Sequence, residues 1–323
     1  MLLTLGLLFL QLAGASLQTK DFYRLANHSM GSFYQGNVIL NETSSNEENE
    51  IFIESQEFSV KETTFHRGDA EVTLREICLK KNNRKLLLLL ENGILTDCNY
   101  ENKFPKQCTE EILSSGNLKS SISLYKQENN SLSIITKFPW LWNVENLYKQ
   151  CRDIKSRNRN QIIHQQRQWN QQTRLERFRK SEENHNRSRR DLFLIPGTKW
   201  CGKGYSATKY TSLGGFGTAD SCCRKHDTSC PFWIPAFESR YGLYNWGVST
   251  MMHCACDERF RTCLKMAQSS SANMVGKIFF NVIRLKCFIL KKRKKKICKK
   301  WATKSKCLEY EKYKAVLKKN LYY

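Results

Sequence analysis

Proline, glycine and long apolar runs are all scarce in this chain. The 323 residues include 5 Pro and 16 Gly, too few for a collagen-like repeat, so a fibrous protein is excluded. Beyond the N-terminus the longest apolar run, Leu86–Leu90, ends at Glu91 and is far shorter than the ~20 residues that span a bilayer. We find no internal repeat. A hydrophobic fraction of 40% predicts a globular chain of roughly two domains.

Acidic residues are also in the minority. Lys and Arg number 53 against 30 Asp and Glu, so the formal net charge is +23. Most of the excess lies after residue 190, where about 26 basic residues face 8 acidic ones, and it is densest in Lys291–Trp301. Such a run is typical of a solvated loop, and here it predicts binding to an anionic phospholipid membrane surface, with heparan sulfate as the competing partner. Trp301 and Phe232–Ile234 are candidates for insertion at the lipid boundary, and nothing resembles a nucleic-acid reading surface.

The N-terminus predicts entry into the secretory pathway. Residues 1–15 combine a leucine-rich run with Ala13-Gly14-Ala15, a small-x-small cleavage signature, and so form a predicted signal peptide. The protein is expected to be secreted and extracellular, where cysteines pair as disulfides. Four Asn-x-Ser/Thr triplets fit a secreted glycoprotein. They begin at Asn27, Asn41, Asn129 and Asn186.

A second processing signal divides the chain. Arg187-Ser188-Arg189-Arg190 has the Arg-x-Arg-Arg form cut by secretory convertases. It ends a segment, 151–190, whose many Gln, Asn, Arg and Glu residues predict an exposed, poorly packed linker. The 14 cysteines divide evenly, with four before the site and ten after it. Each half can therefore form its own disulfides, and cleavage would leave no cysteine unpaired.

The region 16–150 offers no catalytic constellation. Asn37–Leu40, Ile51–Val60 and Leu86–Leu95 are typical of strands between polar turns. We interpret this region as a pro-region or accessory module that contains β-structure.

The candidate chemistry begins in a glycine-containing loop after Pro196. In Trp200-Cys201-Gly202-Lys203-Gly204, alternate carbonyl groups point the same way along an extended backbone, and the two glycines let it curl around an ion. Backbone carbonyls together with a carboxylate are typical ligands of Ca²⁺.

A cysteine-rich helix pair follows. Thr218–Thr228 is predicted to be a helix in which the adjacent Cys222 and Cys223 point in different directions, one toward Cys201 and one toward a second helix. The spacing of His253–Cys263 predicts that second helix, with Asp257 on its apolar stripe. If the two helices are bridged, His226 comes close to Asp257, and an imidazole oriented by a carboxylate can take a proton from water.

Two plainer interpretations of His226 remain. A lone histidine beside cysteines is often a zinc ligand or a hydrogen-bonded core residue. Secretion and the adjacent cysteine pair disfavour zinc. The remaining histidines are assigned to structure or surface.

These motifs carry a family resemblance. Pro196–Gly204, the run Cys222-Cys223-Arg224-Lys225-His226-Asp227, Cys254–Asp257 and Val275–Asn281 closely resemble the bee-venom-type (group III) secreted phospholipases A2. The resemblance extends over 191–321, and 191–323 is therefore expected to be a mainly α, disulfide-rich catalytic domain. It implies two stapled antiparallel helices, a calcium loop and a short β element.

The resemblance also implies residue roles and a reaction. His226 would be the general base and Asp257 its orienting carboxylate; Trp200, Gly202 and Gly204, with Asp227, would hold Ca²⁺. The reaction would be hydrolysis of the sn-2 ester of phospholipids, and the processed domain is expected to be a monomer. The family's disulfide pattern implies the pairs Cys201–Cys223, Cys222–Cys263, Cys230–Cys256, Cys254–Cys287 and Cys298–Cys307.

The sequence departs from the family pattern at two points. One additional residue separates Asp227 from Cys230, so a bulge or a helix end must absorb a rotation of about 100°. Phe279 stands where the bee-venom enzyme has a tyrosine that hydrogen-bonds the catalytic aspartate. An alternative function is a catalytically silent module that binds heparan sulfate or a receptor; the additional residue favours it, and the intact motif residues favour an enzyme.

Overall fold

The computed structural model describes residues 38–44, 47–68, 70–101, 108, 112, 126–128, 138–180, 194–301 and 307–323. The predicted signal peptide, the Arg187–Arg190 site and the glycosylation triplets at Asn27, Asn129 and Asn186 lie outside these residues. Asn41 lies in strand β1, opposite Phe52 of β2.

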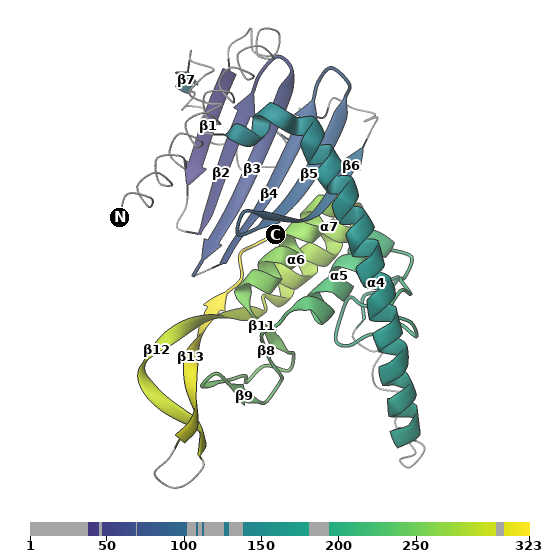
Figure 1. Cartoon of the computed structure of the whole chain (residues 1–323), viewed down its shortest axis with the longest axis vertical. Helices are drawn as coiled ribbons and strands as arrows, with labels where there is room; N and C mark the ends of the chain where they lie inside the picture. The colour runs from purple at the N-terminus through teal and green to yellow at the C-terminus, as the bar shows by residue number, and fades with distance from the viewer. Residues whose placement is uncertain are drawn as a thin grey trace, which may run out of the picture.

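An antiparallel sheet dominates the described N-terminal half (Figure 1). Its strand order is β6-β5-β4-β3-β2-β1-β7, so six consecutive strands form a simple meander. This confirms the prediction of a β-containing region. The strands are β1 (Val38–Ser44), β2 (Glu48–Glu54), β3 (Phe58–Arg67), β4 (Ala70–Leu79), β5 (Arg84–Glu91), β6 (Ile94–Glu101) and β7 (Lys126–Glu128).

Two of the predicted strands, Ile51–Val60 and Leu86–Leu95, each include a turn and parts of two neighbouring strands. The predicted strand Leu86–Leu95 includes most of β5, a turn and the start of β6, because Asn92 and Gly93 adopt positive φ angles of 50° and 76°. These angles suit a tight hairpin turn. Strand β4 went unpredicted since charged residues interrupt its apolar pattern. One of them, Arg75, is paired across the strands, with its Nε 2.6 Å from Glu62.

Both faces of the sheet are covered, which explains the five consecutive leucines of β5. Leu86 and Leu88 pack on the face covered by helix α4, whereas Leu87 and Leu89 pack on the opposite face with Met266 of helix α6. Side chains alternate along a strand, so a continuous apolar run is expected only where both faces are buried.

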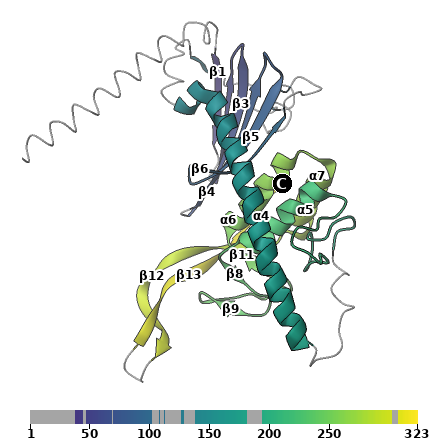
Figure 2. The ribbon, with the colours of Figure 1, turned by 45° about the vertical axis from the view of Figure 1, so that its right-hand side comes forward.

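Helix α4 (Val144–Lys180) follows the short helix η3 (Pro139–Asn143) and crosses one face of the sheet before passing alongside the C-terminal half (Figures 1 and 2). Most described side chains from residue 151 onward are exposed, as predicted, but the segment is a regular helix that packs on both halves rather than a poorly packed linker. Cys151 and Ile154 are buried, and Ile162 and Trp169 pack against the C-terminal half. A sparse apolar stripe on a polar helix is enough for packing. No helix in the described ranges is long and apolar enough to cross a membrane.

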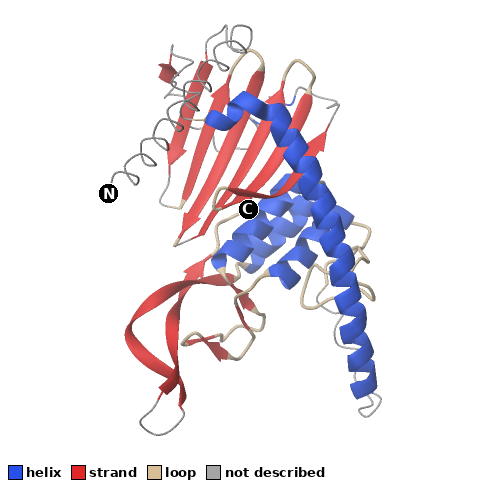
Figure 3. Cartoon of the chain, in the orientation of Figure 1, coloured by secondary structure: helices blue, strands red, loops and turns tan. Residues whose placement is uncertain are grey.

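The C-terminal half is a helix pair with a long β-hairpin (Figure 3). All five disulfides implied by the family resemblance are present. Its elements are α5 (Gly217–Ser229), β8 (Trp233–Ile234), β9 (Ser239–Arg240), β10 (Leu243–Tyr244), β11 (Met251–Met252), α6 (Cys254–Ala267), α7 (Ser270–Gly276), the π-helix η4 (Lys277–Ile283), β12 (Lys286–Trp301) and β13 (Cys307–Lys319).

Two bridges join α5 to α6 in opposite order along the two helices. Cys222 pairs with Cys263, and Cys230 pairs with Cys256, so the helices run antiparallel. The additional residue before Cys230 is absorbed by the helix end. Helix α5 stops at Ser229, and Cys230 is extended, with φ −81° and ψ 120°.

The β-structure of this half is larger than the short element expected. Strands β12 and β13 have 16 and 13 residues, and their pairing includes the first part of the lysine-rich stretch. The consecutive residues Cys287, Phe288 and Ile289 of β12 are buried, and its pairing with β13 continues through Lys291 and Lys292, so these lysines lie on a strand rather than in a loop. The predicted insertion of Ile234 into lipid is also wrong, because this side chain is fully buried against Phe288 and Ala315.

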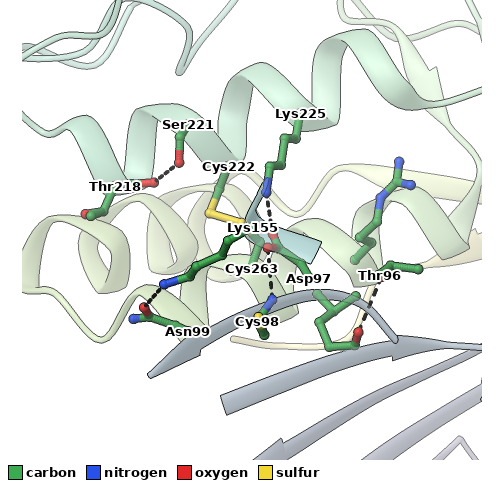
Figure 4. A network of polar contacts seen from close by, with 12 residues as sticks. Thr96, Asp97, Cys98, Asn99, Lys155, Thr218, Ser221, Cys222, Lys225 and Cys263 are labelled. Carbon is green, nitrogen blue, oxygen red and sulfur yellow. Dashed lines mark hydrogen bonds and ion pairs between the residues drawn. A yellow bond between two sulfur atoms is a disulfide. The ribbon is translucent and has the colours of Figure 1, made fainter. Parts of the chain in front are cut away.

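The two halves contact each other without a shared disulfide. Cys78–Cys108 and Cys98–Cys151 close within the N-terminal half, and the other ten cysteines pair among themselves. Ion pairs cross the boundary instead, including the Lys225–Asp97 contact seen in Figure 4. Two more lie on α6: Arg261 is 2.7 Å from Glu48, and Arg259 is 3.6 Å from Glu91.

Truncation of a side chain inside the sheet should destabilise the N-terminal half. Leu88 is 0% exposed, so Leu88→Ala leaves a cavity and should cost about 2–5 kcal/mol of unfolding free energy. Urea unfolding followed by circular dichroism measures the cost. Ile94, which is 69% exposed, is the control, and Ile94→Ala should change stability little. Equal effects of the two substitutions would contradict the assignment of the core.

Candidate active site

Helices α5 and α6 bring the predicted histidine and aspartate into contact. His226 Nε2 lies 2.7 Å from Asp257 Oδ1, and both side chains are buried. An ionised carboxylate can only accept hydrogen bonds, so Nε2 carries the proton and donates it to Asp257. Nδ1 is then the basic nitrogen, and it lies 3.5 Å from Asp227 Oδ1.

Asp257 has a second partner that the sequence analysis missed. Asn320 Nδ2 donates to Asp257 Oδ2 at 2.6 Å and to the carbonyl of Leu285 at 3.0 Å. Asn320 follows β13, so the hairpin brings it back to α6 from 63 positions away in the sequence. No local spacing signals such a contact. Asn320 supplies a hydrogen bond to Asp257 that Phe279, which has no hydroxyl, does not.

Aromatic rings surround the imidazole. Phe260 stacks on His226 with 4.6 Å between ring centroids, and Phe279 meets it edge-on at 5.5 Å. These contacts fix the plane of the ring and exclude water from it. Phe279 therefore contributes apolar packing to His226.

The two carboxylates change the proton affinity of His226. Burial lowers the pKa of the imidazole, but hydrogen bonds and attraction from Asp227 and Asp257 outweigh burial and raise the pKa to about 9. Burial raises the pKa of the Asp227 carboxyl, although His226 opposes this. In the absence of a bound cation, the imidazole is therefore held in its charged form at neutral pH.

The loop before α5 is anchored by a buried acid that the sequence analysis also missed. The Asp220 carboxylate accepts hydrogen bonds from the backbone N–H groups of Lys199, Trp200 and Gly214, at 2.7–3.0 Å. Asp220 is 0% exposed, so its charge is balanced by these donors. Asp220 lies in the first turn of α5, where the helix dipole also favours a negative charge.

The predicted backbone ligands of the cation are carbonyl oxygens of residues 200–204, which we call the glycine loop. They alternate along the chain with carbonyls that already accept hydrogen bonds. The carbonyl of Lys199 accepts from Ser206, and that of Cys201 accepts from Ile195. No described residue donates a hydrogen bond to the carbonyl of Trp200, Gly202 or Gly204. Three oxygens of the glycine loop are therefore available to a cation.

Backbone geometry and donor chemistry both fit a hard cation. Gly202 and Gly204 have φ angles of 148° and 89°, which side chains with a Cβ rarely adopt. The disulfide Cys201–Cys223 ties the glycine loop to α5 one helical turn before Asp227. Three backbone oxygens and one carboxylate suit Ca²⁺. Zinc binding by the cysteines is excluded, because every cysteine is in a disulfide.

A cavity of about 340 Å³ also reaches His226. Leu89 of β5, Ile162 of α4 and Phe260 of α6 lie on its walls, so both halves of the chain enclose it. Neither the glycine loop nor Asp227 lines it. His226 therefore lines this cavity and also contacts Asp227, a predicted cation ligand.

Comparison with known proteins identifies the class. A family model described as phospholipase A2 matches residues 194–291. The chain is 45% identical over 98 residues to phospholipase A2 isozymes PA3A/PA3B/PA5 of Heloderma suspectum, a match that covers 30% of this chain and 68% of that protein. It is 42% identical over 122 residues to a phospholipase A2 of Bombus terrestris, covering 36% of this chain and 88% of that protein.

The chain therefore belongs to the phospholipase A2 family, and it is an enzyme of that type. A further relative is the group 3 secretory phospholipase A2 of Homo sapiens, at 41% identity over 117 residues. The match covers 36% of this chain but only 22% of the human protein. The matched family segment lies in the C-terminal half and includes every predicted site residue. It does not include Asn320 or any of α4.

Replacing Asp257 should lower the pKa of His226. In Asp257→Asn the loss of one negative partner should move the pKa from about 9 toward the ordinary value of 6.5. Nuclear magnetic resonance titration of the imidazole, in the presence of a chelator, measures the shift. An unchanged titration would contradict the role assigned to the contact.

The same shift has a consequence for stability. A pKa raised in the folded state stabilises the metal-free fold fully below about 6.5, and this contribution is lost as the pH rises through about 9. The wild-type advantage over Asp257→Asn, measured by urea unfolding, should shrink across that range.

Proposed function

We propose that the chain is a secreted, calcium-dependent phospholipase A2 that hydrolyses the sn-2 ester of glycerophospholipids to a fatty acid and a lysophospholipid. The observation that carries the proposal is the buried His226–Asp257 pair. Asp227 lies beside His226, and the disulfide Cys201–Cys223 ties the glycine loop to the same helix. Seven disulfides favour an extracellular location.

His226 would act as the general base through Nδ1. This nitrogen takes a proton from a water molecule, whose oxygen attacks the ester carbonyl carbon. Asp257 holds the Nε2–H and stabilises the imidazolium that forms, while Asn320 holds Asp257 in place. When the tetrahedral intermediate collapses, the bond to the glycerol oxygen breaks and the proton on Nδ1 passes to that oxygen. No acyl-enzyme forms.

Calcium, held by the carbonyls of Trp200, Gly202 and Gly204 and by Asp227, would supply positive charge for the substrate phosphate and the developing oxyanion. Asp227 also links the cation site to the base. When this carboxylate serves as a ligand, its charge is no longer available to the imidazolium, so the neutral form of His226 is favoured. Proton acceptance requires that neutral form.

The basic hairpin and the aromatic residues near it are the surface we propose for membrane binding. Lys291, Lys292 and Lys294 are exposed on β12, whereas Arg293 is paired with Glu311 at 2.7 Å. Trp246, 81% exposed, lies in the loop after β10 and suits the boundary between water and lipid. Of the tripeptide predicted for insertion, only Phe232 and Trp233 remain exposed.

We also propose that residues 16–190 act as a pro- or accessory region and that cleavage follows Arg190. The convertase-type sequence supports the proposal. So does the fact that each disulfide joins two cysteines of the same half. Mass spectrometry of the secreted protein tests it, since Arg190→Ala should prevent the appearance of a fragment that starts at Asp191.

Removal of the base should abolish hydrolysis without loss of the fold. His226→Gln should lower the rate of fatty-acid release from phospholipid vesicles by at least about 10²–10⁴-fold, because general-base catalysis is worth that much. His164, an exposed residue on α4, is the matched control, and His164→Gln should retain full activity. Chelation of calcium should abolish release by the wild-type chain.

Each outcome of that assay has a defined meaning. Release of the sn-2 chain alone, dependent on calcium and on His226, supports the proposed reaction. An active, folded His226→Gln protein would overturn the mechanism. A calcium-loaded wild-type chain that releases nothing would favour the silent binding module.

Charge reversal on the hairpin should weaken membrane binding. Each lysine near an anionic surface contributes about 1 kcal/mol, so loss of three lysines alone weakens binding about 100-fold. A chain with Lys291, Lys292 and Lys294 all changed to Glu also gains repulsion, and it should bind phosphatidylserine vesicles at least about 100-fold more weakly. Vesicle sedimentation at physiological salt measures binding. Competition by heparin separates the two anionic partners.

The control reverses the same number of charges on another surface. Vesicle binding should persist in this control, and equal losses in both variants would show attraction by net charge alone. If heparin binds tightly and vesicles do not, heparan sulfate is the partner. The exposed basic residues of α4 to be changed to Glu in the control are Lys149, Arg152 and Arg157.

A further inference from the structure

Helix α4 carries a residue of the N-terminal half to the glycine loop. The disulfide Cys98–Cys151 fixes α4 to the sheet, and from Cys151 the helix runs past the C-terminal half (Figure 2). At 1.5 Å per residue, Trp169 lies about 27 Å along the axis from Cys151. Helix α4 is therefore a rigid element that is fixed covalently to the sheet at Cys151.

Trp169 inserts into a cluster of aromatic rings. Its ring centroid lies 5.5 Å from that of Trp200, 4.9 Å from that of Tyr205 and 6.2 Å from that of Tyr210. The rings of Trp200 and Tyr205 stack on each other at 5.1 Å. Trp200 is only 1% exposed, and this cluster is part of the core that buries it.

A second residue of α4 holds the segment that supports the cluster. Gln166 Oε1 accepts hydrogen bonds from the backbone N–H and the hydroxyl of Thr211, at 2.9 and 3.0 Å. The neighbouring carbonyl of Ser212 accepts from Trp200 Nε1 at 2.8 Å. The helix therefore contacts the Trp200 side chain directly and also holds its hydrogen-bond partner.

Trp200 and Tyr205, two residues that contact Trp169, lie at the two ends of the glycine loop. Trp200 begins the loop and Tyr205 directly follows Gly204, so the aromatic cluster joins both ends. Between them Gly202 and Gly204 have no side chains with which to restrict the backbone. A loop of this kind loses conformational entropy when it binds an ion, and any contact that orders it beforehand reduces that loss.

We propose that Trp169 is a positioning residue for the calcium site, through which the N-terminal half raises the calcium affinity of the C-terminal half. The inference rests on the proposed role of the glycine loop as a calcium ligand. It assigns a function to a residue outside the matched family segment. Trp169 acts through Trp200 and Tyr205 and need not touch the ion.

Calorimetric titration of the full chain with calcium chloride tests the proposal. The wild-type dissociation constant is expected at about 10⁻⁴–10⁻³ M, as in extracellular modules. Trp169→Ala should raise it about fivefold, in line with the strength of aromatic pairs. Trp169→Phe, which keeps a ring, should restore most of the affinity. Ile163→Ala is the matched control, since Ile163 is 47% exposed on the same helix.

A second readout needs no calcium. Hydrogen exchange of the amides of 202–205 in the metal-free chain should be faster in Trp169→Ala than in wild type, and unchanged in Ile163→Ala. Exchange in α5 should stay the same in all variants. General acceleration throughout the C-terminal half would show a merely structural role and overturn the proposal.

The titration separates two kinds of failure. If the wild-type chain binds no calcium, the proposed calcium site is wrong. If it binds calcium and Trp169→Ala binds equally well, the calcium site stands and the role of Trp169 is overturned. In assays of activity, Trp169→Ala should need more calcium for half-maximal rate but reach nearly the same rate at saturation.

Discussion

The register between α5 and α6 is the constraint on which the rest of the site depends. Cys222–Cys263 and Cys230–Cys256 bridge the pair near both ends of the contact. Between the bridges, neither helix can slide or rotate by a residue, and His226 faces Asp257. A shift of one residue would turn either side chain by about 100°. The proton-accepting pair is therefore a property of the covalent framework rather than of the two residues alone.

Much of this site could be predicted because its signals are local. His226, Asp227 and Asp257 lie in short helical motifs, and the loop from Trp200 to Gly204 has alternating carbonyls and two glycines. Asn320 and Trp169 could not be found in this way. Each belongs to an element that is distant in the sequence, and no local motif around either residue predicts its contact with the site. Asp220 is intermediate, since only the folded loop gives its carboxylate three donors.

The errors at the level of the fold have a common physical origin. Polar composition predicts a linker from residue 151 onward, and it predicts a loop for the lysine-rich stretch. Both segments instead pack through a few apolar residues: Ile162 and Trp169 on α4, and Phe288 on β12. A regular element needs only one apolar stripe to dock on a neighbour, so average polarity underestimates packing.

Because no disulfide links the two halves, only the backbone joins them covalently. In the intact chain the halves are tethered, so their docking is unimolecular and independent of concentration. Once the backbone is cut between 180 and 194, no covalent link remains, and the same docking becomes a bimolecular equilibrium. Ion pairs such as Glu48–Arg261 would then weaken as ionic strength rises. Dilution, which does not affect docking in the tethered protein, would then add to the effect of salt in deciding whether α4 stays docked on the C-terminal half.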